Sequence, residues 1–256
     1  MLLGEPPQTQ YDLRFHIFGI PVRVHPWFWA IVVILGISGG GQTPPVDLLI
    51  WVGCVFVSIL VHELGHACLA RAYGWKPWIT LYGFGGLASY QPTRHDWRSQ
   101  VLISFAGPLA GFLFIGLIMA AVQVSGHPVQ LFPETPVVGF HPLFPPWALF
   151  APFESANINT LIWYLWQINI LWGILNLLPI YPLDGGQIAR ELCLQGNRSR
   201  GVEQSLWISI ITAGGVVGFC LMNREIYLAF MFGYLAYTSY SILQQFSGGQ
   251  SGGRPW

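Results

Sequence analysis

One apolar stretch constrains the fold of this chain more strongly than any other part of its sequence. Residues 46–68 read VDLLIWVGCVFVSILVHELGHAC, and the only charged or imidazole side chains in this apolar stretch are Asp47 at its start and the three residues His62, Glu63 and His66. Ionisable groups at bilayer depth cost roughly 2.5–3.5 kcal/mol each on insertion scales, so they are rarely retained there without a function. The stretch therefore predicts a membrane-spanning helix that carries a functional site.

The three polar residues form the pattern H-E-x-x-H, whose spacing suits a metal centre. Residues four apart on an α-helix project about 40° from each other, so both imidazoles lie on one face. Two imidazoles on one face supply half of a tetrahedral zinc site. Glu63 lies beside the metal, where its carboxylate can accept a proton from water. The alternative, two histidines satisfied by neighbouring groups on a helix surface, is what a soluble helix would favour.

The composition is that of a membrane protein. The 256 residues are 53% hydrophobic and 9% charged, whereas a soluble globular protein has about 25% charged residues. The formal net charge is zero, which argues against nucleic acid as a partner. We expect an all-α polytopic membrane protein, formed as a single domain of residues 1–256 with its core at about 46–195. Apolar segments predict about six transmembrane helices, at about 26–39, 46–73, 98–124, 157–178, 203–222 and 225–245.

Segments outside the predicted spans have other patterns. Residues 74–91 (GWKPWITLYGFGGLASYQ) place β-branched and aromatic residues around a glycine cluster, which predicts a small membrane-associated β-hairpin. Residues 15–25 alternate apolar and polar side chains and fit either a strand or an interfacial segment. Residues 125–156 are rich in proline and aromatic residues and contain no Lys or Arg, which predicts a loop or a re-entrant segment.

The positive charges predict the orientation in the membrane. With six spans, ten of the eleven Lys and Arg residues fall on the side of both termini, and only Arg224 falls on the other. Cytoplasmic loops carry an excess of Lys and Arg, so we expect both termini in the cytoplasm. The HELGH motif then lies in the cytoplasmic half of the second span.

A catalytic zinc needs a third protein ligand and an open position, and Asp184 is the best candidate. It follows a predicted span within LPIYPLDGG, where Pro179 and Pro182 prevent a regular helix. Interrupted helices are tolerated at membrane depth only where they line protein or a polar cavity. Asp184 also falls at the same end of the predicted bundle as HELGH. Its alternative role is the N-cap of a helix that starts near Gln187.

Asn176 lies eight residues before Asp184 and next to the same interruption. Its amide can donate a hydrogen bond to a substrate carbonyl or to a developing oxyanion. The alternative role is an interhelical hydrogen bond, because such contacts are ordinary in membrane bundles.

Three motifs together resemble a known family. HELGH in one span, SFAGPLAGF in the next and NLLPIYPLDGG after another resemble, in this order, the site-2 protease family of intramembrane zinc metalloproteases, peptidase family M50. The resemblance covers roughly residues 46–195 and fits the six-span type. The PDZ and CBS modules of many relatives are not recognisable in this sequence, and Tyr181 stands where one branch of the family has proline.

The resemblance implies a role for each polar residue of the predicted site. His62, His66 and Asp184 would bind one zinc ion per chain. Glu63 would be the catalytic base, and Asn176 would help to position the substrate. The implied reaction is hydrolysis of a peptide bond within or near the transmembrane segment of a membrane-protein substrate, as in regulated intramembrane proteolysis.

The resemblance also implies how and where a substrate binds. The glycine-rich hairpin resembles the β element along which such proteases extend their substrates, and the matching residues are Gly85, Gly86, Leu87 and Ala88. The expected partners are a single-span membrane protein and the lipid bilayer, and the expected location is a prokaryotic cell membrane. The sequence leaves the substrate's identity and the oligomeric state open.

Three other functions are alternatives. A zinc transporter needs ligands along a path to both faces of the membrane, but no ionisable cluster lies in the outer halves of the spans. A catalytically inactive, metal-binding scaffold would not require Glu63. A membrane-anchored protease that acts on soluble proteins is disfavoured because the sequence shows no sizeable soluble domain.

Overall fold

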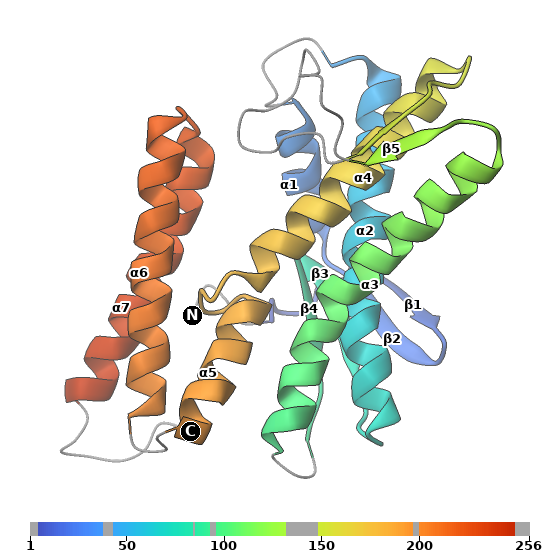
Figure 1. Ribbon diagram of the computed structural model, residues 1–256. Coiled ribbons are helices and arrows are strands. Elements are labelled where there is room, and N and C mark those ends of the chain that lie inside the picture. The colour runs from blue at the N-terminus through green and yellow to red at the C-terminus, as the bar shows by residue number, and fades with distance from the viewer. Residues whose placement is uncertain are drawn as a thin grey trace. The chain divides into compact units, whose positions relative to one another are not determined.

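The computed structural model describes residues 5–37, 43–83, 85–92, 96–131, 148–196 and 200–248 (Figure 1). They form two compact units: the first contains the described residues of 1–94, 106–140 and 144–173, and the second contains those of 95–105, 141–143 and 174–256. The helices are α1 (Pro26–Ile37), α2 (Pro45–Ala72), α3 (Trp97–Val124), α4 (Ala156–Leu177), α5 (Asp184–Gly196), α6 (Gly201–Met222) and α7 (Ile226–Gly248). The strands are β1 (Leu13–Ile17), β2 (Ile20–Val24), β3 (Trp78–Tyr82), β4 (Gly85–Ser89), β5 (Val129–Leu131) and β6 (Ala148–Phe150).

Five helices of the described residues are long and apolar enough to cross a membrane, namely α2, α3, α4, α6 and α7. They confirm the predicted class, a mostly helical membrane protein with a small β element. The first predicted span differs, because α1 has only 12 residues. At 1.5 Å per residue it extends about 18 Å, which is less than the ~30 Å hydrocarbon core. Residues 38–42, where the predicted span at about 26–39 ends, lie outside the described residues.

The predicted hairpin is confirmed as β3 and β4, which pair antiparallel with Leu81 opposite Gly86. The structure adds two strands, because β1 and β2 form a second hairpin and β2 pairs parallel with β3. Residues 15–25 are therefore mainly strand, with a tight turn at Phe18 and Gly19, both at positive φ. The sheet order is β1-β2-β3-β4, so β4 is an edge strand.

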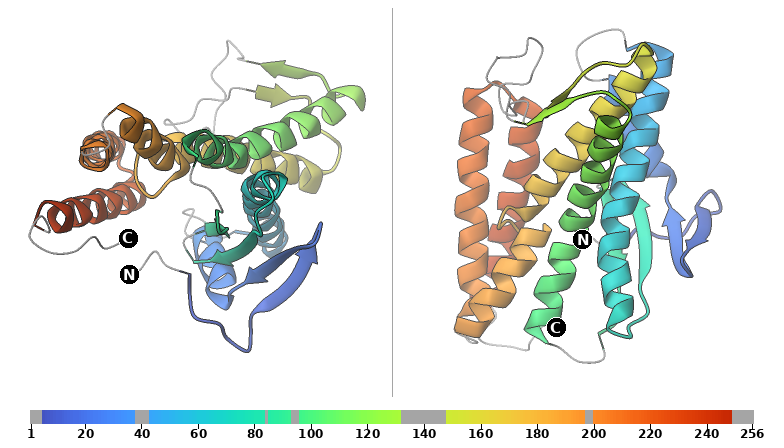
Figure 2. Two further views of the ribbon diagram at one scale, coloured as in Figure 1. Left: turned by 90° about the horizontal axis from the view of Figure 1, so that it is seen from below. Right: turned by 45° about the vertical axis from the view of Figure 1, so that its right-hand side comes forward.

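The sheet and α1 lie beside different halves of α2 (Figure 2). Along the first half of α2, the Trp51 Nε1 donates a hydrogen bond to the carbonyl of Val32 on α1, over 2.9 Å. The second half contacts β3 and β4. The backbone N–H of His25, between β2 and α1, donates to the Leu81 carbonyl over 2.8 Å. The chain thus runs beside α2 first as strand β2 and then as helix α1. Because the sheet covers one half of α2, α1 needs to cover only the other half and can be short.

One face of the sheet contributes to the hydrophobic core of the first unit, through side chains that alternate along the strands. Val22, Val24, Ile79 and Leu81 are all buried and belong to the same cluster as Phe28 of α1. Such alternation places the intervening residues on the opposite face. That opposite face therefore carries the polar side chains of β2 and β3.

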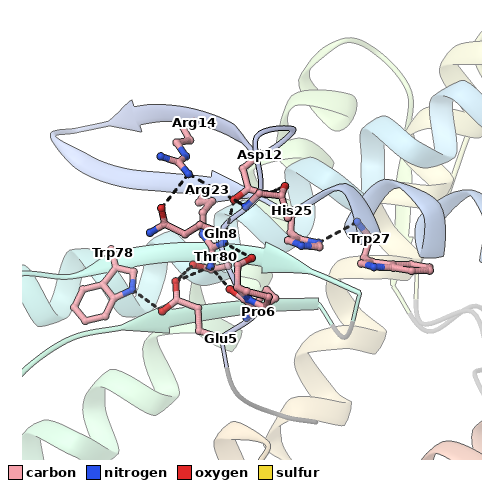
Figure 3. Close-up of polar contacts among 12 residues, drawn as sticks. Glu5, Pro6, Gln8, Asp12, Arg14, Arg23, His25, Trp27, Trp78 and Thr80 are labelled. Atoms are coloured by element: carbon pink, nitrogen blue, oxygen red, sulfur yellow. Dashed lines mark hydrogen bonds and ion pairs between the residues drawn. The ribbon is translucent and has the colours of Figure 1, made fainter. Parts of the chain in front are cut away.

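The opposite face binds the segment before β1 through a buried arginine (Figure 3). The Arg23 guanidinium donates to Glu5 over 2.9 Å and to Asp12 over 3.1 Å, and Thr80 also donates to Glu5. Burial by itself raises the pKa of Asp12, but hydrogen bonds from Thr9 and the Arg23 charge outweigh it and lower that pKa to about 2. Asp12 is therefore ionised near neutral pH, and it fastens this segment to the sheet.

In the second unit α6 packs beside both α5 and α7 (Figure 1). Ile180, Ala213, Phe232 and Leu235 form its buried apolar cluster. Between α4 and α5 the chain turns sharply, and the backbone N–H of Tyr181 donates to Ser209 Oγ on α6 over 3.0 Å. The predicted break after the fourth span is thus present and is held by α6.

The predicted loop at 125–156 begins and ends with strands. β5 and β6 pair antiparallel, with Val129 opposite Phe150. The His127 ring stacks on Phe153, with ring centroids 3.6 Å apart. Residues 132–147, in the middle of this segment, lie outside the described residues.

Candidate metal centre

The H-E-x-x-H residues lie in the middle of the second half of α2 and are all buried. The exposed fractions of His62, Glu63 and His66 are 4%, 4% and 6%. The two Nε2 atoms are 3.2 Å apart, and the rings are nearly perpendicular. Two nitrogens bound to one tetrahedral zinc at 2.0–2.1 Å would be about 3.3 Å apart. The two imidazoles therefore have the separation that a shared zinc requires.

Glycine residues on α3 and on α2 itself make room for the His66 ring and for close contact between the two helices. A Cβ atom built on Gly107 of α3 would overlap the His66 ring. One built on Gly65 of α2 would overlap the backbone carbonyl of Ala106 on α3, so the two helices are in close contact there. The small residues of SFAGPLAGF permit such close helix contact, but the specific apposition of Gly107 and His66 was not predicted.

Glu63 lies against the edge strand β4. A Cβ atom built on Gly86 would overlap the Glu63 carboxylate, so only glycine leaves room for it. Gly86 and Ala88 alternate with Leu87 along β4, and Ala88 packs against the core of the first unit. The strand that was predicted to bind substrate therefore passes directly beside the predicted base.

Asp184 is the first residue of α5, three residues earlier than the helix start expected near Gln187. The two glycines that follow it are required by close backbone contacts. A Cβ atom on Gly185 would overlap the Leu177 carbonyl, and one on Gly186 would lie 2.5 Å from the Ile180 carbonyl. The glycines of LPIYPLDGG thus permit the tight turn that places Asp184 at the start of its helix.

His62, His66 and Asp184 form a group that can hold one metal ion. One ligand atom of each residue lies within 4.8 Å of those of the other two. Two imidazole nitrogens and one carboxylate oxygen make up a donor set typical of catalytic zinc. The group found among the described residues therefore consists of the same three residues that were predicted as zinc ligands. Asn176, on the last turn of α4, is buried with an exposed fraction of 9%.

The fold and the site together define a class. This is an integral, multi-pass membrane protein whose metal-binding group includes an H-E-x-x-H motif inside a spanning helix. Residues 50–221 match peptidase family M50, and the chain belongs to that family.

Two proteins similar to this chain come from a bacterium and an archaeon. It is 30% identical over 200 residues to the "putative zinc metalloprotease sll0528" of Synechocystis, covering 73% of this chain and 45% of that protein. It is 30% identical over 190 residues to the "zinc metalloprotease MJ0392" of Methanocaldococcus jannaschii, covering 71% and 45%. The chain thus spans about half the length of these relatives.

The fold is similar to that of a solved protease. The "Site-2 Protease from Methanocaldococcus jannaschii" superposes with a TM-score of 0.56 and 25% sequence identity, covering 91% of this chain and 95% of that one. The family resemblance noted in the motifs is therefore confirmed by both sequence and fold.

Alanine at Gly107 tests whether α3 shapes the metal centre. The added methyl group would push the His66 ring from its position, so we expect the affinity for zinc to fall by roughly tenfold or more, as for other changes behind metal ligands. The matched control is Gly116→Ala in the same helix, where a Cβ atom meets nothing within 4 Å. Competition with a zinc-selective chelator measures the affinity. Equal zinc affinity in the two variants would contradict the assigned role of Gly107.

Proposed function

We propose that this chain is a zinc metalloprotease that hydrolyses a peptide bond within or near the transmembrane segment of a membrane-protein substrate. The observation that carries the proposal is the buried Glu63 carboxylate, which follows His62 on α2 and lies against Gly86 of the edge strand β4. Family membership supports the same reaction class. We place this activity in one integral membrane domain, residues 1–256, with its core at about 46–195.

In this proposal His62, His66 and Asp184 hold the zinc ion. A bound zinc ion supplies Lewis acidity toward both water and a peptide carbonyl. The two histidines come from one helical face, and the aspartate is presented by the first turn of α5. A donor set of three side chains would leave the bound ion accessible to water or substrate.

Glu63 acts as the general base and then as the general acid. It lies outside the three-residue ligand group, and in this proposal its carboxylate accepts a proton from the attacking water. The same carboxyl group then donates that proton to the leaving amine. Such proton transfer contributes typically about 10²–10⁴-fold to a rate.

Asn176 assists by donating an amide hydrogen bond to the substrate carbonyl. Its burial on the last turn of α4 supports a positioned role, because hydrogen bonds hold a buried amide in one orientation. A fixed donor aimed at developing negative charge is worth more in a dry site than in water.

Gly85, Gly86, Leu87 and Ala88 bind the substrate as an added strand. All four residues lie in β4. This strand is paired with β3 on one side and is the last strand of the sheet, so its other edge is the free one. An unwound transmembrane segment needs partners for its backbone groups, and an exposed strand edge provides them. The substrate backbone would then pass beside Glu63.

The depth of the site supports cleavage within the membrane. Directly after α2 come Tyr73, Trp75 and Lys76, and the Trp75 ring stacks on Tyr90. Aromatic and basic residues gather at membrane interfaces. His66 and His62 precede Tyr73 by seven and eleven residues, which corresponds to about 10–16 Å along the helix. A site at this depth favours a single-span membrane protein as the substrate, as in regulated intramembrane proteolysis.

Both termini lie in the cytoplasm of a prokaryotic cell in this proposal. The ten-to-one distribution of Lys and Arg supports the orientation, and β2 with α1 together supply the length that α1 alone lacks. The bacterial and archaeal relatives support the prokaryotic membrane.

Glu63→Gln separates the proposed base from the metal ligands. We expect the variant to retain zinc but to cut a single-span substrate at least about a hundredfold more slowly, because glutamine cannot accept the proton. Elemental analysis and electrophoresis of a co-reconstituted substrate measure the two properties. Glu203→Gln, in the first turn of α6, is the control with expected normal activity. Loss of zinc together with activity would make Glu63 a ligand or a structural residue.

Proline substitutions on β4 test the strand-addition step. Neighbouring residues of a strand direct their N–H groups to opposite edges, so one of Leu87→Pro and Ala88→Pro removes a donor from the free edge. We expect that variant to lose cleavage while keeping its zinc and its melting temperature. Leu13→Pro, at the first position of the opposite edge strand β1, should be tolerated. Normal cleavage by both β4 variants would reduce the hairpin to a connector.

Thiol labelling tests the orientation. In a background with Cys68 and Cys193 replaced by serine, we expect Ser125→Cys to react with an impermeant maleimide in intact cells. Gln195→Cys, exposed near the end of α5, should react only after the cells are opened. The reverse pattern would invert the proposed topology.

A further inference from the structure

The first two residues of β4 are enclosed from both sides. The Cβ direction of Gly86 meets Glu63 of α2, whereas that of Gly85 meets the indole of Trp172 on α4. A Cβ atom on Gly85 would lie 2.9 Å from Trp172 Cζ2 and 3.1 Å from Cη2. Gly85 also has a φ of +117°, which favours glycine. The strand therefore begins between an aromatic ring and the Glu63 carboxylate.

The position of Trp172 is fixed independently of the sheet. Asn169, three residues earlier on α4, donates from Nδ2 to Ser58 Oγ on α2 over 2.9 Å. Both residues are buried, with exposed fractions of 3% and 2%, and Ser58 lies one helical turn before His62. Gly173, next to Trp172, contacts the Phe112 ring of α3. The helix that carries Trp172 is thus anchored both to α2, which carries the H-E-x-x-H motif, and to α3.

We propose that Trp172 is a positioning residue, whose indole holds the start of β4 against Glu63. The proposal rests on the proposed function, because it concerns how a substrate strand on β4 is aligned with the base. It assigns Trp172 no contact with the reacting atoms. Trp172 acts through the backbone of Gly85 and Gly86.

The physical need for such a residue follows from the sequence of the strand. Glycine has more backbone freedom than any other residue, and it weakens a strand because it has no side chain to pack. Two glycines at the start of an edge strand would leave this segment mobile unless a neighbour confined it. A misplacement of about 1 Å can cost a hundredfold in rate. Confinement by Trp172 therefore affects how the bound substrate is aligned with Glu63. It does not affect how tightly the rest of β4 binds the substrate.

The alternative is that Trp172 only fills space in the core, and Trp166 provides the matched control for it. Trp166 lies on the same helix, is more deeply buried with an exposed fraction of 7%, and stacks on Trp163. If general packing explained the effect of changing Trp172, the same change at Trp166 would have at least as large an effect. Alanine and phenylalanine at both positions make the comparison.

The experiment combines hydrogen exchange with kinetics on the purified, zinc-loaded protein. In Trp172→Ala we expect exchange of the β4 amides to be about tenfold faster, with β1 and β2 unchanged. We expect kcat on a single-span substrate to fall roughly tenfold or more, with KM within about twofold and zinc retained. Trp172→Phe should recover part of both losses, and the Trp166 variants should leave β4 exchange unchanged.

Two results would overturn the proposal. One is β4 exchange in Trp172→Ala equal to that of the wild type. The other is exchange that increases equally across all four strands, or equally in the Trp166 variants, which would indicate general loosening. The exchange measurement needs no substrate, so failure of the wild type to cut any substrate would contradict the proposed function and leave the exchange result to decide the role of Trp172.

Discussion

The structure of the first unit depends on one constraint, which is the burial of two imidazoles and a carboxylate on an otherwise apolar helix. Groups of this kind are costly at membrane depth unless they are paired or bind a metal. The neighbouring elements accommodate them by omitting side chains. Gly107 of α3 makes room for His66, and Gly86 of β4 makes room for Glu63. Polar chemistry on α2 and the absence of side chains opposite it are therefore two aspects of one arrangement.

The element opposite Glu63 is an edge strand and not another helix. A helix opposite Glu63 would have all its backbone groups satisfied internally, whereas an edge strand offers unpaired N–H and C=O groups. The outer face of this sheet is stabilised by Arg23, which binds Glu5 and Asp12. A sheet that is packed on one face and tied on the other can present an edge without unfolding.

Much of this arrangement could be predicted from the sequence. The helical spacing of His62 and His66 predicts that both lie on one face. Asp184 was assigned to the same group from the interruption at Pro179 and Pro182, from the predicted topology and from the family resemblance. The β3–β4 hairpin was predicted from a local pattern, namely β-branched and aromatic residues on both sides of a glycine cluster. The pairing of β2 with β3 was not predictable, because this parallel pair joins residues as distant in the sequence as Val22 and Ile79 and leaves no local signal. The roles of Gly107 and Trp172 depend on which side chains face each other, which periodicity does not specify.

The central claim is that two imidazoles and one carboxylate hold a single zinc ion. X-ray absorption at the zinc edge of the purified protein tests this claim most directly, because imidazole rings and sulfur atoms scatter differently. The account predicts only nitrogen and oxygen neighbours at about 2.0–2.2 Å, with the outer-shell scattering of two imidazoles. A neighbour at about 2.3 Å, typical of zinc bound to cysteine sulfur, or an imidazole number other than two, would contradict it.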